Sequence, residues 1–547
     1  MNVVLDIETD SLDTQKAKIH CIVAKDFETS QVHVWDHNNL DQFKPWCDKV
    51  DNFIMHNGIS FDVPILRRVF GVNIKINQMI DTLVMSQLFN PVRERGHSLK
   101  AWGETLHYPK GECENFTTYT EDMLEYCKND VDLTEQVYKK LKQEGRNFSE
   151  KSINMEHKIR TIIDQQETNG FALDIRKTIG LLSRLSDEAH ELVNWSKVTF
   201  QSTVVELKTK PNKVVPFNIG SRQQIAACLQ ALDWEPKDFT DKGNVIVSEE
   251  ILNKIDKEEA QKFSRYFLLQ KRIAQVQSWI NSYNDNTGRV HGRVLTLRTI
   301  TGRMAHMSPN MAQIPAVRSP FGFECRDCWT VSNPHTHKLV GTDASGLELR
   351  CLAHLMDNKD YTNEILNGDV HTANMKMAGI TDRDQAKTFI YAFLYGAGAE
   401  KIGKIVGGSR KKGQDLIDKF LSNMPDLKRV RNNVQKAAQR HKIKGVDGRY
   451  LHTRSPHSAL NTLIQGAGAS VCKDWLINMT SRVNRKGLDV KLVASIHDEY
   501  QFEVAKKDIP QFGLITKEGI KDTERNLKFK CPLDSTWKDG ETWATTH

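Results

Sequence analysis

The stretch RDQAKTFIYAFLYG, residues 383–396, decides the fold of this chain. Arg383, Lys387, Tyr391 and Tyr395 recur at every fourth position, so on a helix they lie along one slowly turning face. At about 1.5 Å per residue this face is about 18 Å long, enough to run beside a nucleotide from its outermost phosphate to its base. Cations suit the phosphates, and tyrosines suit the sugar and base. Because a plain surface helix would carry mixed charges there and a buried one aliphatic residues, the pattern predicts a nucleotide-binding helix.

Two acidic residues flank this helix in the sequence. A strand-like run ends at Asp343, and residues 492–496 and 500–504 alternate like two strands with Asp498 in the turn between them. A hairpin tip beside the first strand would bring Asp343 and Asp498 together. Two such acids can hold two magnesium ions, with triphosphate oxygens filling the other ligand positions. The neighbouring Glu499 either assists a metal or is a solvated acid of the hairpin.

A second set of acids occupies the N-terminal part of the chain. Asp6 and Glu8 are two residues apart in a strand-like run, so both point to one face. Asp62 follows another strand-like run, and Tyr126 and Asp130 are four residues apart on a helical stretch. Four carboxylates and a tyrosine are what two-metal phosphodiester hydrolysis requires. The pattern therefore predicts a nuclease site.

Composition limits the class of protein. A chain of 547 residues should hold about three to five domains or subdomains. A net charge of +7 is compatible with a polyanionic partner. No window resembles a membrane span, and the N-terminus lacks a signal peptide's basic region. Ten scattered cysteines fit a reducing cytoplasm, and we expect Cys325 and Cys328 to be half-buried thiols rather than zinc ligands, because no second pair follows.

Six motifs resemble those of two known families in their order and spacing. DASGLELRCLAH (343–354), RDQAKTFIYAFLYGAG (383–398) and IHDEYQFEV (496–504) resemble motifs A, B and C of family A DNA polymerases, above all those of short-tailed phages. DIET (6–9), NGISFD (57–62) and YCKND (126–130) resemble the three motifs of the DEDDy 3′→5′ exonucleases.

The resemblance implies a fold of mixed α/β and α+β type with several domains. An RNase H-like 3′→5′ exonuclease domain would be followed by a polymerase shaped like a right hand. The periodicity along the chain divides it into five segments, and the resemblance implies that these are the exonuclease at 1–150, the thumb at 151–285, the first part of the palm at 286–356, the fingers at 357–456 and the second part of the palm at 457–547.

The resemblance also implies a role for individual residues. In the polymerase, Asp343, the backbone carbonyl of Ala344 and Asp498 would bind metal; His371, Arg383 and Lys387 would hold the triphosphate; Tyr391 would pack on the sugar, Tyr395 would lie by the templating position, and Glu348 would block a ribose 2′-OH; Arg303, Gln313, Asn461, Gln465 and His497 would touch the primer-template. In the exonuclease, Asp6, Glu8, Asp62 and Asp130 would be metal ligands, Tyr126 would position the nucleophile, and Asp81 would be a structural cap rather than a ligand.

Cofactors, partners and location follow from the same resemblance. We expect two Mg²⁺ ions per site, replaceable by Mn²⁺, with primer-template DNA, dNTPs and single-stranded DNA as ligands. Phage relatives carry a long thumb insertion that docks thioredoxin; the corresponding stretch, Thr203 to Phe217, is short, so we expect no thioredoxin partner. We also expect no preceding 5′-nuclease domain and no membrane association. We expect a monomer that replicates viral DNA in the cytoplasm of an infected bacterial host. A helicase or a single-strand-binding protein is a candidate partner.

Two alternatives stay open at this point. A single-subunit RNA polymerase shares the RxxxKxxxYG pattern, although Glu348 and an editing domain argue for DNA synthesis. A nuclease whose polymerase half only binds DNA is the second alternative, although both acids and the complete nucleotide helix argue against it.

Overall fold

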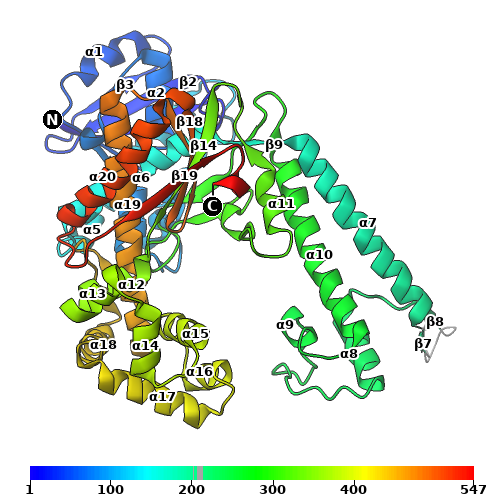
Figure 1. Ribbon diagram of the computed structural model, residues 1–547. Coiled ribbons are helices and arrows are strands. Elements are labelled where there is room, and N and C mark those ends of the chain that lie inside the picture. Colours follow the sequence, from blue (N-terminus) through cyan, green and yellow to red (C-terminus); the bar gives the residue numbers. More distant parts are fainter. Residues whose placement is uncertain (201–202, 206–212, 547) are drawn as a thin grey trace. The chain divides into compact units, whose positions relative to one another are not determined.

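The computed structural model describes residues 1–200, 203–205 and 213–546 (Figure 1). The chain forms two compact units, each described here by itself. The first comprises residues 1–169, 294–306 and 340–538, and the second comprises residues 170–293, 307–339 and 539–547. Within the described residues, no helix is both long and apolar enough to cross a membrane.

The first unit begins with a five-stranded sheet of order β3-β2-β1-β4-β5. The central strand β1 pairs antiparallel with β2 and parallel with β4. The strands span Asn2–Thr9 (β1), Ile19–Asp26 (β2), Val32–Trp35 (β3), Asn52–Met55 (β4) and Met79–Asp81 (β5). Six helices accompany them: Phe43–Cys47 (α1), Asp62–Phe70 (α2), Thr82–Phe89 (α3), Leu99–Leu106 (α4), Glu121–Glu144 (α5) and Glu150–Asn169 (α6).

Alternation along β1 decides which residues meet which helix. Val3 and Leu5 pack into a core formed with α1 and α2. Val4 points to the opposite face and packs against Cys127 and Val131 of α5. Asp6 and Glu8 have the same parity as Val4, so they face α5 as well.

The helix cap predicted at Asp81 is confirmed. Its carboxylate accepts hydrogen bonds from the amides of Leu83 (2.9 Å) and Val84 (3.3 Å) at the start of α3. It also accepts bonds from the amides of Asn57 and Ile59, both at 3.1 Å. Through these four hydrogen bonds the Asp81 carboxylate joins the start of α3 to the segment that precedes Asp62.

A second sheet in the first unit has the order β17-β18-β14-β19. Helices α19 and α20 lie side by side next to it (Figure 1). The bounds are His337–Ala344 (β14), Leu347–Met356 (α12), Ala459–Lys486 (α19), Val490–Ile496 (β17), Glu499–Ala505 (β18), Ile509–Asn526 (α20) and Ser535–Gly540 (β19). Most of α19 is buried, and the Tyr500 hydroxyl on β18 donates to the Cys472 carbonyl of α19 at 2.9 Å. The strand and hairpin predicted around Asp343 and Asp498 are therefore confirmed.

Six further helices and two two-stranded ribbons belong mainly to the first unit. The helices span Lys359–Asn367 (α13), Val370–Ala378 (α14), Arg383–Leu394 (α15), Ala399–Ile405 (α16), Arg410–Asn423 (α17) and Pro425–Ala437 (α18). The ribbon pairs Lys442–Lys444 (β15) with Tyr450–His452 (β16), and the short strands Arg293–Leu295 (β11) and Ala305–Met307 (β12) form another pair. The predicted nucleotide helix is α15. Phe389 and Phe393, on the face opposite the predicted one, are buried in the core. Tyr395 is the C-cap residue that ends the helix.

The second unit is built on two long helices, α7 (Ile175–Thr199) and α10 (Glu258–Asn281), which pack together. Its other elements are Phe171–Leu173 (β6), Thr203–Val205 (β7), Lys213–Val215 (β8), Arg222–Ala231 (α8), Glu249–Leu252 (α9), Tyr283–Asn284 (β9), Arg289–Val290 (β10), Gly322–Asp327 (α11) and Trp329–Thr330 (β13). Cys325 and Cys328 are fully buried here, more than expected.

One expectation about the second unit is wrong, and one cannot be judged. The apolar pattern of residues 251–281 in the sequence predicts one helical stretch, but α9 ends at Leu252 and α10 begins at Glu258. The amides of Lys254 and Ile255 bond to carbonyls only three residues back, which closes tight turns and ends α9. The expectation of no thioredoxin partner rests on the stretch from Thr203 to Phe217, of which residues 206–212 lie outside the described residues.

Candidate active sites

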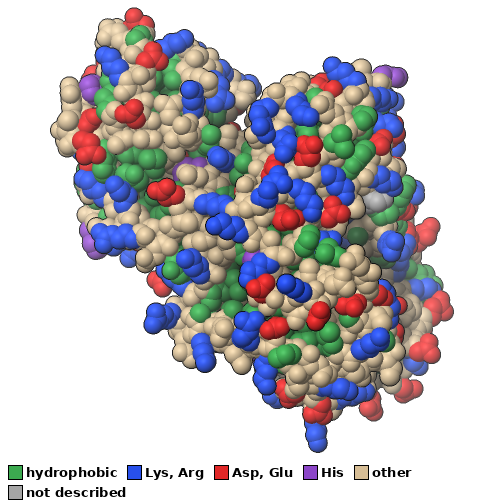
Figure 2. All heavy atoms as spheres, turned by 60° about the vertical axis from the view of Figure 1, so that its left-hand side comes forward, with side chains coloured by type: hydrophobic (Ala, Val, Ile, Leu, Met, Phe, Trp, Pro, Cys, Tyr) green, Lys and Arg blue, Asp and Glu red, His purple; other side chains and the backbone are tan. Residues whose placement is uncertain are grey.

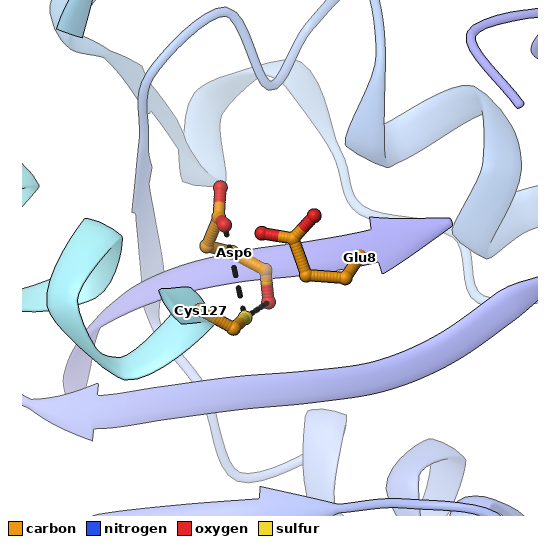
Figure 3. A group of neighbouring side chains, drawn as sticks. All are labelled: Asp6, Glu8 and Cys127. Atoms are coloured by element: carbon orange, nitrogen blue, oxygen red, sulfur yellow. Dashed lines mark hydrogen bonds between the residues drawn. The ribbon is translucent and has the colours of Figure 1, made fainter. Parts of the chain in front are cut away.

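Asp6, Glu8 and Cys127 form a compact group of potential metal ligands (Figure 3). One ligand atom from each lies within 4.8 Å of the others. The Cys127 thiol donates to the carbonyl oxygen of Asp6 (3.6 Å) and to its Oδ2 (3.7 Å). Strand β1 and helix α5 therefore bring together Asp6 and Glu8, which the sequence predicts to face the same way, and the Cys127 thiol, which the sequence does not predict at this site.

Asp62 and Asp130 lie close enough to this group for their charges to act on Asp6. Burial raises the pKa of Asp6 well above its ordinary value, and the negative charges of Glu8, Asp62 and Asp130 raise it further. Burial is also the main cause that raises the pKa of Glu8 to about 8 and that of Asp62 to about 7. Four acids that repel one another while buried need positive charge to become ionised.

Lys110 supplies one positive charge and was not predicted from the sequence. Its Nζ lies 2.7 Å from Asp130 Oδ2 and 4.9 Å from the centroid of the Tyr126 ring. Lys110 belongs to the segment between α4 and α5, in a Pro-Lys-Gly sequence that matches no motif. It lines a groove of about 820 Å³ together with Tyr126 and Phe116.

The second pair of acids meets at the end of β14. The amide of Ala344 donates to the Asp498 carbonyl at 3.1 Å, so the β17–β18 turn lies against this strand end. Burial raises the pKa of Asp343 to about 7, with further contributions from Asp498, Glu499 and Glu348. Burial likewise raises the pKa of Asp498, followed by the charge of Glu348.

The turn residues around Asp498 differ from expectation at one position. His497 adopts a left-handed backbone conformation with φ of 57°, which allows the tight hairpin. Glu499 pairs with Ile496 as the first residue of β18. It is buried, and its Oε1 accepts a 2.8 Å bond from Gln501 Nε2. The alternative that Glu499 is a solvated hairpin acid is therefore wrong.

Glu348 connects three of the predicted site residues. Its Oε1 accepts hydrogen bonds from Arg303 Nη2 and from the Tyr395 hydroxyl, both at 3.1 Å. Asn461 Nδ2 in turn donates to the Tyr395 carbonyl at 3.3 Å. A single carboxylate thus holds the start of α12 next to the end of α15.

Helix α15 presents the predicted face, with one unexpected partner. Arg383 donates to both carboxylate oxygens of Asp369, from Nε at 2.7 Å and from Nη2 at 3.0 Å. The ring of His371 lies 6.1 Å from that of Tyr391, and His371 Nδ1 is buried without a hydrogen-bond partner among the described residues. Burial, followed by the charges of Lys387 and Arg383, lowers the pKa of His371.

Of the predicted DNA contacts, only Arg303 and Asn461 have side-chain hydrogen bonds to Glu348 or Tyr395 within the described residues; Gln313, Gln465 and His497 do not. Gln465 lies on α19, one turn after Asn461. Gln313 ends a short 3₁₀ helix (Met311–Gln313) in the second unit, where its carbonyl accepts from Gln275 Nε2 at 2.9 Å. On the face drawn in Figure 2, Lys and Arg side chains are interspersed with Asp and Glu, so charge alone does not trace a DNA path there.

Comparison with known proteins matches both parts of the chain. A family model described as DNA polymerase family A matches residues 190–545, and one described as 3′-5′ exonuclease matches residues 2–146. The DNA-directed DNA polymerases of Enterobacteria phage T3 and Escherichia phage T7 are each 31% identical over 707 aligned positions, which cover 100% of both chains. DNA polymerase I of Bacillus subtilis (strain 168) is 25% identical over 86% of this chain and 56% of that one.

A solved structure shows the same fold. The POL domain of Pol1 from M. smegmatis, in complex with DNA primer-template and dNTP, aligns with a TM-score of 0.83 at 18% identity. The alignment covers 100% of this chain and 95% of that one. With a full-length match to phage enzymes and a fold shared with a bacterial one, the chain belongs to DNA polymerase family A and is a DNA-directed DNA polymerase with a 3′-5′ exonuclease domain.

Proposed function

We propose that the chain extends a primer at the site of Asp343 and Asp498 and removes nucleotides from the primer 3′ end at the site of Asp6, Glu8, Asp62 and Asp130. The observation that carries the proposal is the convergence of each acid set from separate segments of the chain. In extension, the primer 3′-oxygen bonds to the α-phosphorus of a dNTP as pyrophosphate leaves. In removal, a water oxygen bonds to phosphorus, the bond to the preceding 3′-oxygen breaks, and a nucleoside monophosphate leaves.

The residues at both sites suit divalent metal ions, which family A polymerases generally use. Buried carboxylates with raised pKa values become ionised when cations neutralise them, and Oδ1 of Asp130 is buried without a hydrogen-bond partner. Asp343, Asp498 and the Ala344 carbonyl would hold the ions at one site, and Asp6, Glu8, Asp62 and Asp130 at the other. Two Mg²⁺ ions per site, or Mn²⁺ in their place, would lower the pKa of the attacking hydroxyl or water and stabilise the leaving oxygen.

The side chains along α15 orient the nucleotide in this proposal. His371, Arg383 and Lys387 bind the triphosphate, and Tyr391 packs on the sugar. Tyr395 lies by the templating base, and Glu348 excludes a ribose 2′-OH. The contacts of Glu348 with Arg303 and Tyr395 support this role, because they hold its carboxylate in one place. Arg303, Gln313, Asn461, Gln465 and His497 touch the primer-template.

The division of the chain into an exonuclease, a thumb, a palm of two parts and fingers is part of the same proposal. Residues 1–150 form the exonuclease, 151–285 the thumb, 286–356 and 457–547 the palm, and 357–456 the fingers. Membership of the family excludes the RNA polymerase alternative and argues against a catalytically inactive polymerase half. The likeness to two phage enzymes supports replication of viral DNA, by a monomer in the cytoplasm of the bacterial host, with removal serving as proofreading.

A separation of function tests the proposal. Asp343→Asn should abolish primer extension and spare degradation of a primer, whereas Asp6→Ala with Glu8→Ala should do the reverse. Both activities are measured on one labelled primer-template, with and without dNTPs. If either variant, still folded by circular dichroism, loses both activities, the two-site model fails.

A further inference from the structure

A lysine lies among the exonuclease acids, and it is held there by a close-packed segment. The Gly111 amide donates to Asn129 Oδ1 of α5 at 3.0 Å. On the other side, a Cβ added to Gly103 would lie only 2.7 Å from the Tyr108 carbonyl and 3.2 Å from the Lys110 amide. Because the backbone on both sides of Lys110 packs this closely, its side chain is presented to α5 rather than left free on the surface.

The ion pair that Lys110 forms with Asp130 of α5 is less exposed than an ordinary surface ion pair on that helix. The side chain of Asp130 is 5% exposed and that of Lys110 25%, whereas Lys128 and Glu125 are 36% and 69% exposed. Exposed ion pairs contribute little to stability, but an acid as buried as Asp130 depends on its partner. The charge of Lys110 also reaches Asp6 and Glu8.

Lys110 also contacts the ring of Tyr126. Its ammonium group lies 4.9 Å from the ring centroid while it pairs with Asp130, so one cation holds both side chains of α5. Lys110 and Tyr126 line the same groove, which places this pair where a nucleic acid strand could enter.

We propose that Lys110 is a positioning residue of the exonuclease reaction, which holds the Asp130 carboxylate through an ion pair and the Tyr126 ring through a cation–π contact, so that the Tyr126 hydroxyl can reach the attacking water or the scissile phosphate. The inference rests on the proposed exonuclease site and adds a residue to it. Lys110 acts through its two neighbours and has no role in gripping the DNA.

The test compares Lys110→Ala with Lys110→Arg and with Lys100→Ala. Lys100 lines the same groove but has no ion pair to the site acids among the described contacts, which makes it a matched control. Hydrolysis of a 3′-labelled single strand should show kcat lowered about 10- to 100-fold by Lys110→Ala, as for loss of one charged positioning group, with KM within about threefold. Lys110→Arg should recover most of the rate, and Lys100→Ala should match the wild type.

Two further measurements exclude a merely structural role. In a Tyr126→Phe background, Lys110→Ala should cost much less than it does alone, because the two residues act as a unit. Binding of the single strand in EDTA, followed by fluorescence anisotropy, should be unchanged. Additive effects of the two substitutions, weaker binding with an unchanged kcat, or wild-type hydrolysis by Lys110→Ala would each overturn the proposal.

Folding and the parent proposal are controlled separately. Primer extension and limited proteolysis check that each variant is folded, and Lys110→Gln replaces Lys110→Ala if the latter unfolds, with the same loss of kcat expected. If Asp6→Ala with Glu8→Ala still degrades DNA, the proposed exonuclease site fails. If that variant is inactive while Lys110→Ala or Lys110→Gln behaves like Lys100→Ala, only the role of Lys110 fails.

Discussion

The main-chain amide of Ala344 donates a 3.1 Å hydrogen bond to the main-chain carbonyl of Asp498. This bond joins the end of β14 to the β17–β18 turn and continues the pairing of β14 with β18 in the sheet. The half-buried Asp343 and Asp498 carboxylates are therefore close enough for the charge of Asp498 to act on Asp343. The raised pKa of each acid is the electrostatic consequence of that placement.

The first prediction concerns stability and pH at Asp343. Its pKa rises from 3.8 to about 7 on folding, so the folded protein holds this proton more tightly than the unfolded chain does. The resulting stabilisation is complete below about pH 4 and is lost as the pH rises through about 7. In EDTA, Asp343→Asn should therefore match the wild type near pH 4 and exceed it at pH 8 by up to roughly 4 kcal/mol.

Thermal unfolding between pH 4 and pH 8 measures this difference. Magnesium should narrow the gap at pH 8 by stabilising the wild type more than the variant. Asp360→Asn, at an exposed position, controls for the substitution itself. Equal melting curves for Asp343→Asn and wild type at every pH would contradict the placement of this acid.

The second prediction concerns Asp369 and the triphosphate. The Asp369 carboxylate accepts two hydrogen bonds from the Arg383 guanidinium. An incoming triphosphate must therefore compete with Asp369 for Arg383. Asp369→Asn removes the competing charge and keeps an oxygen that can cap α14. Because an exposed ion pair is worth about 0–1 kcal/mol, KM for dNTPs should fall by at most about fivefold. Steady-state extension measures KM, and a rise would mean that Asp369 positions Arg383 for binding instead.

The third prediction concerns Tyr391 and dideoxynucleotides. The resemblance to family A polymerases implies that the Tyr391 hydroxyl can replace the contact that a missing 3′-OH would make. Tyr391→Phe should therefore lower dideoxynucleotide incorporation about 10-fold or more relative to dNTPs, as expected for loss of one hydrogen bond in a confined site. Competition between ddNTP and dNTP on one primer gives the ratio. Tyr450→Phe, away from α15, is the control, and an unchanged ratio in Tyr391→Phe would show that the hydroxyl has no such role.

The fourth prediction concerns a buried charge network between α6 and α19. Lys473 Nζ lies 2.8 Å from both carboxylate oxygens of Glu156, and Arg449 binds the same Glu156 and Asp447. All four side chains are at most 2% exposed. Lys473→Met removes one partner and leaves buried charge uncompensated, which should cost about 3–5 kcal/mol.

Denaturant unfolding followed by circular dichroism measures this loss. Lys404→Met is the matched control, because its pair with Glu400 is 70% exposed on both sides. It should change stability by less than about 0.5 kcal/mol. Equal stability of the two variants would show that the network contributes nothing.

The sequence by itself determined the family, the two sets of acids and the local elements that carry them. Helix α15, the β17–β18 hairpin and the cap at Asp81 all follow from short-range periodicity and hydrogen bonding within a few residues. The same reasoning failed between residues 252 and 258, where i→i+3 turns divide a helix whose apolar pattern continues.

Only the tertiary structure decided which side chains oppose one another. The partners Lys110–Asp130 and Arg383–Asp369, and the burial of Glu499, carry no signal in local periodicity. Arg383 and Asp369 meet only because α14 and α15 pack together, and Lys110 meets Asp130 where the segment after α4 packs on α5. A buried acid such as Asp130 must find whatever counter-charge the packing supplies. The acids could thus be read from their spacing, whereas the cations that balance them emerged only from the folded chain.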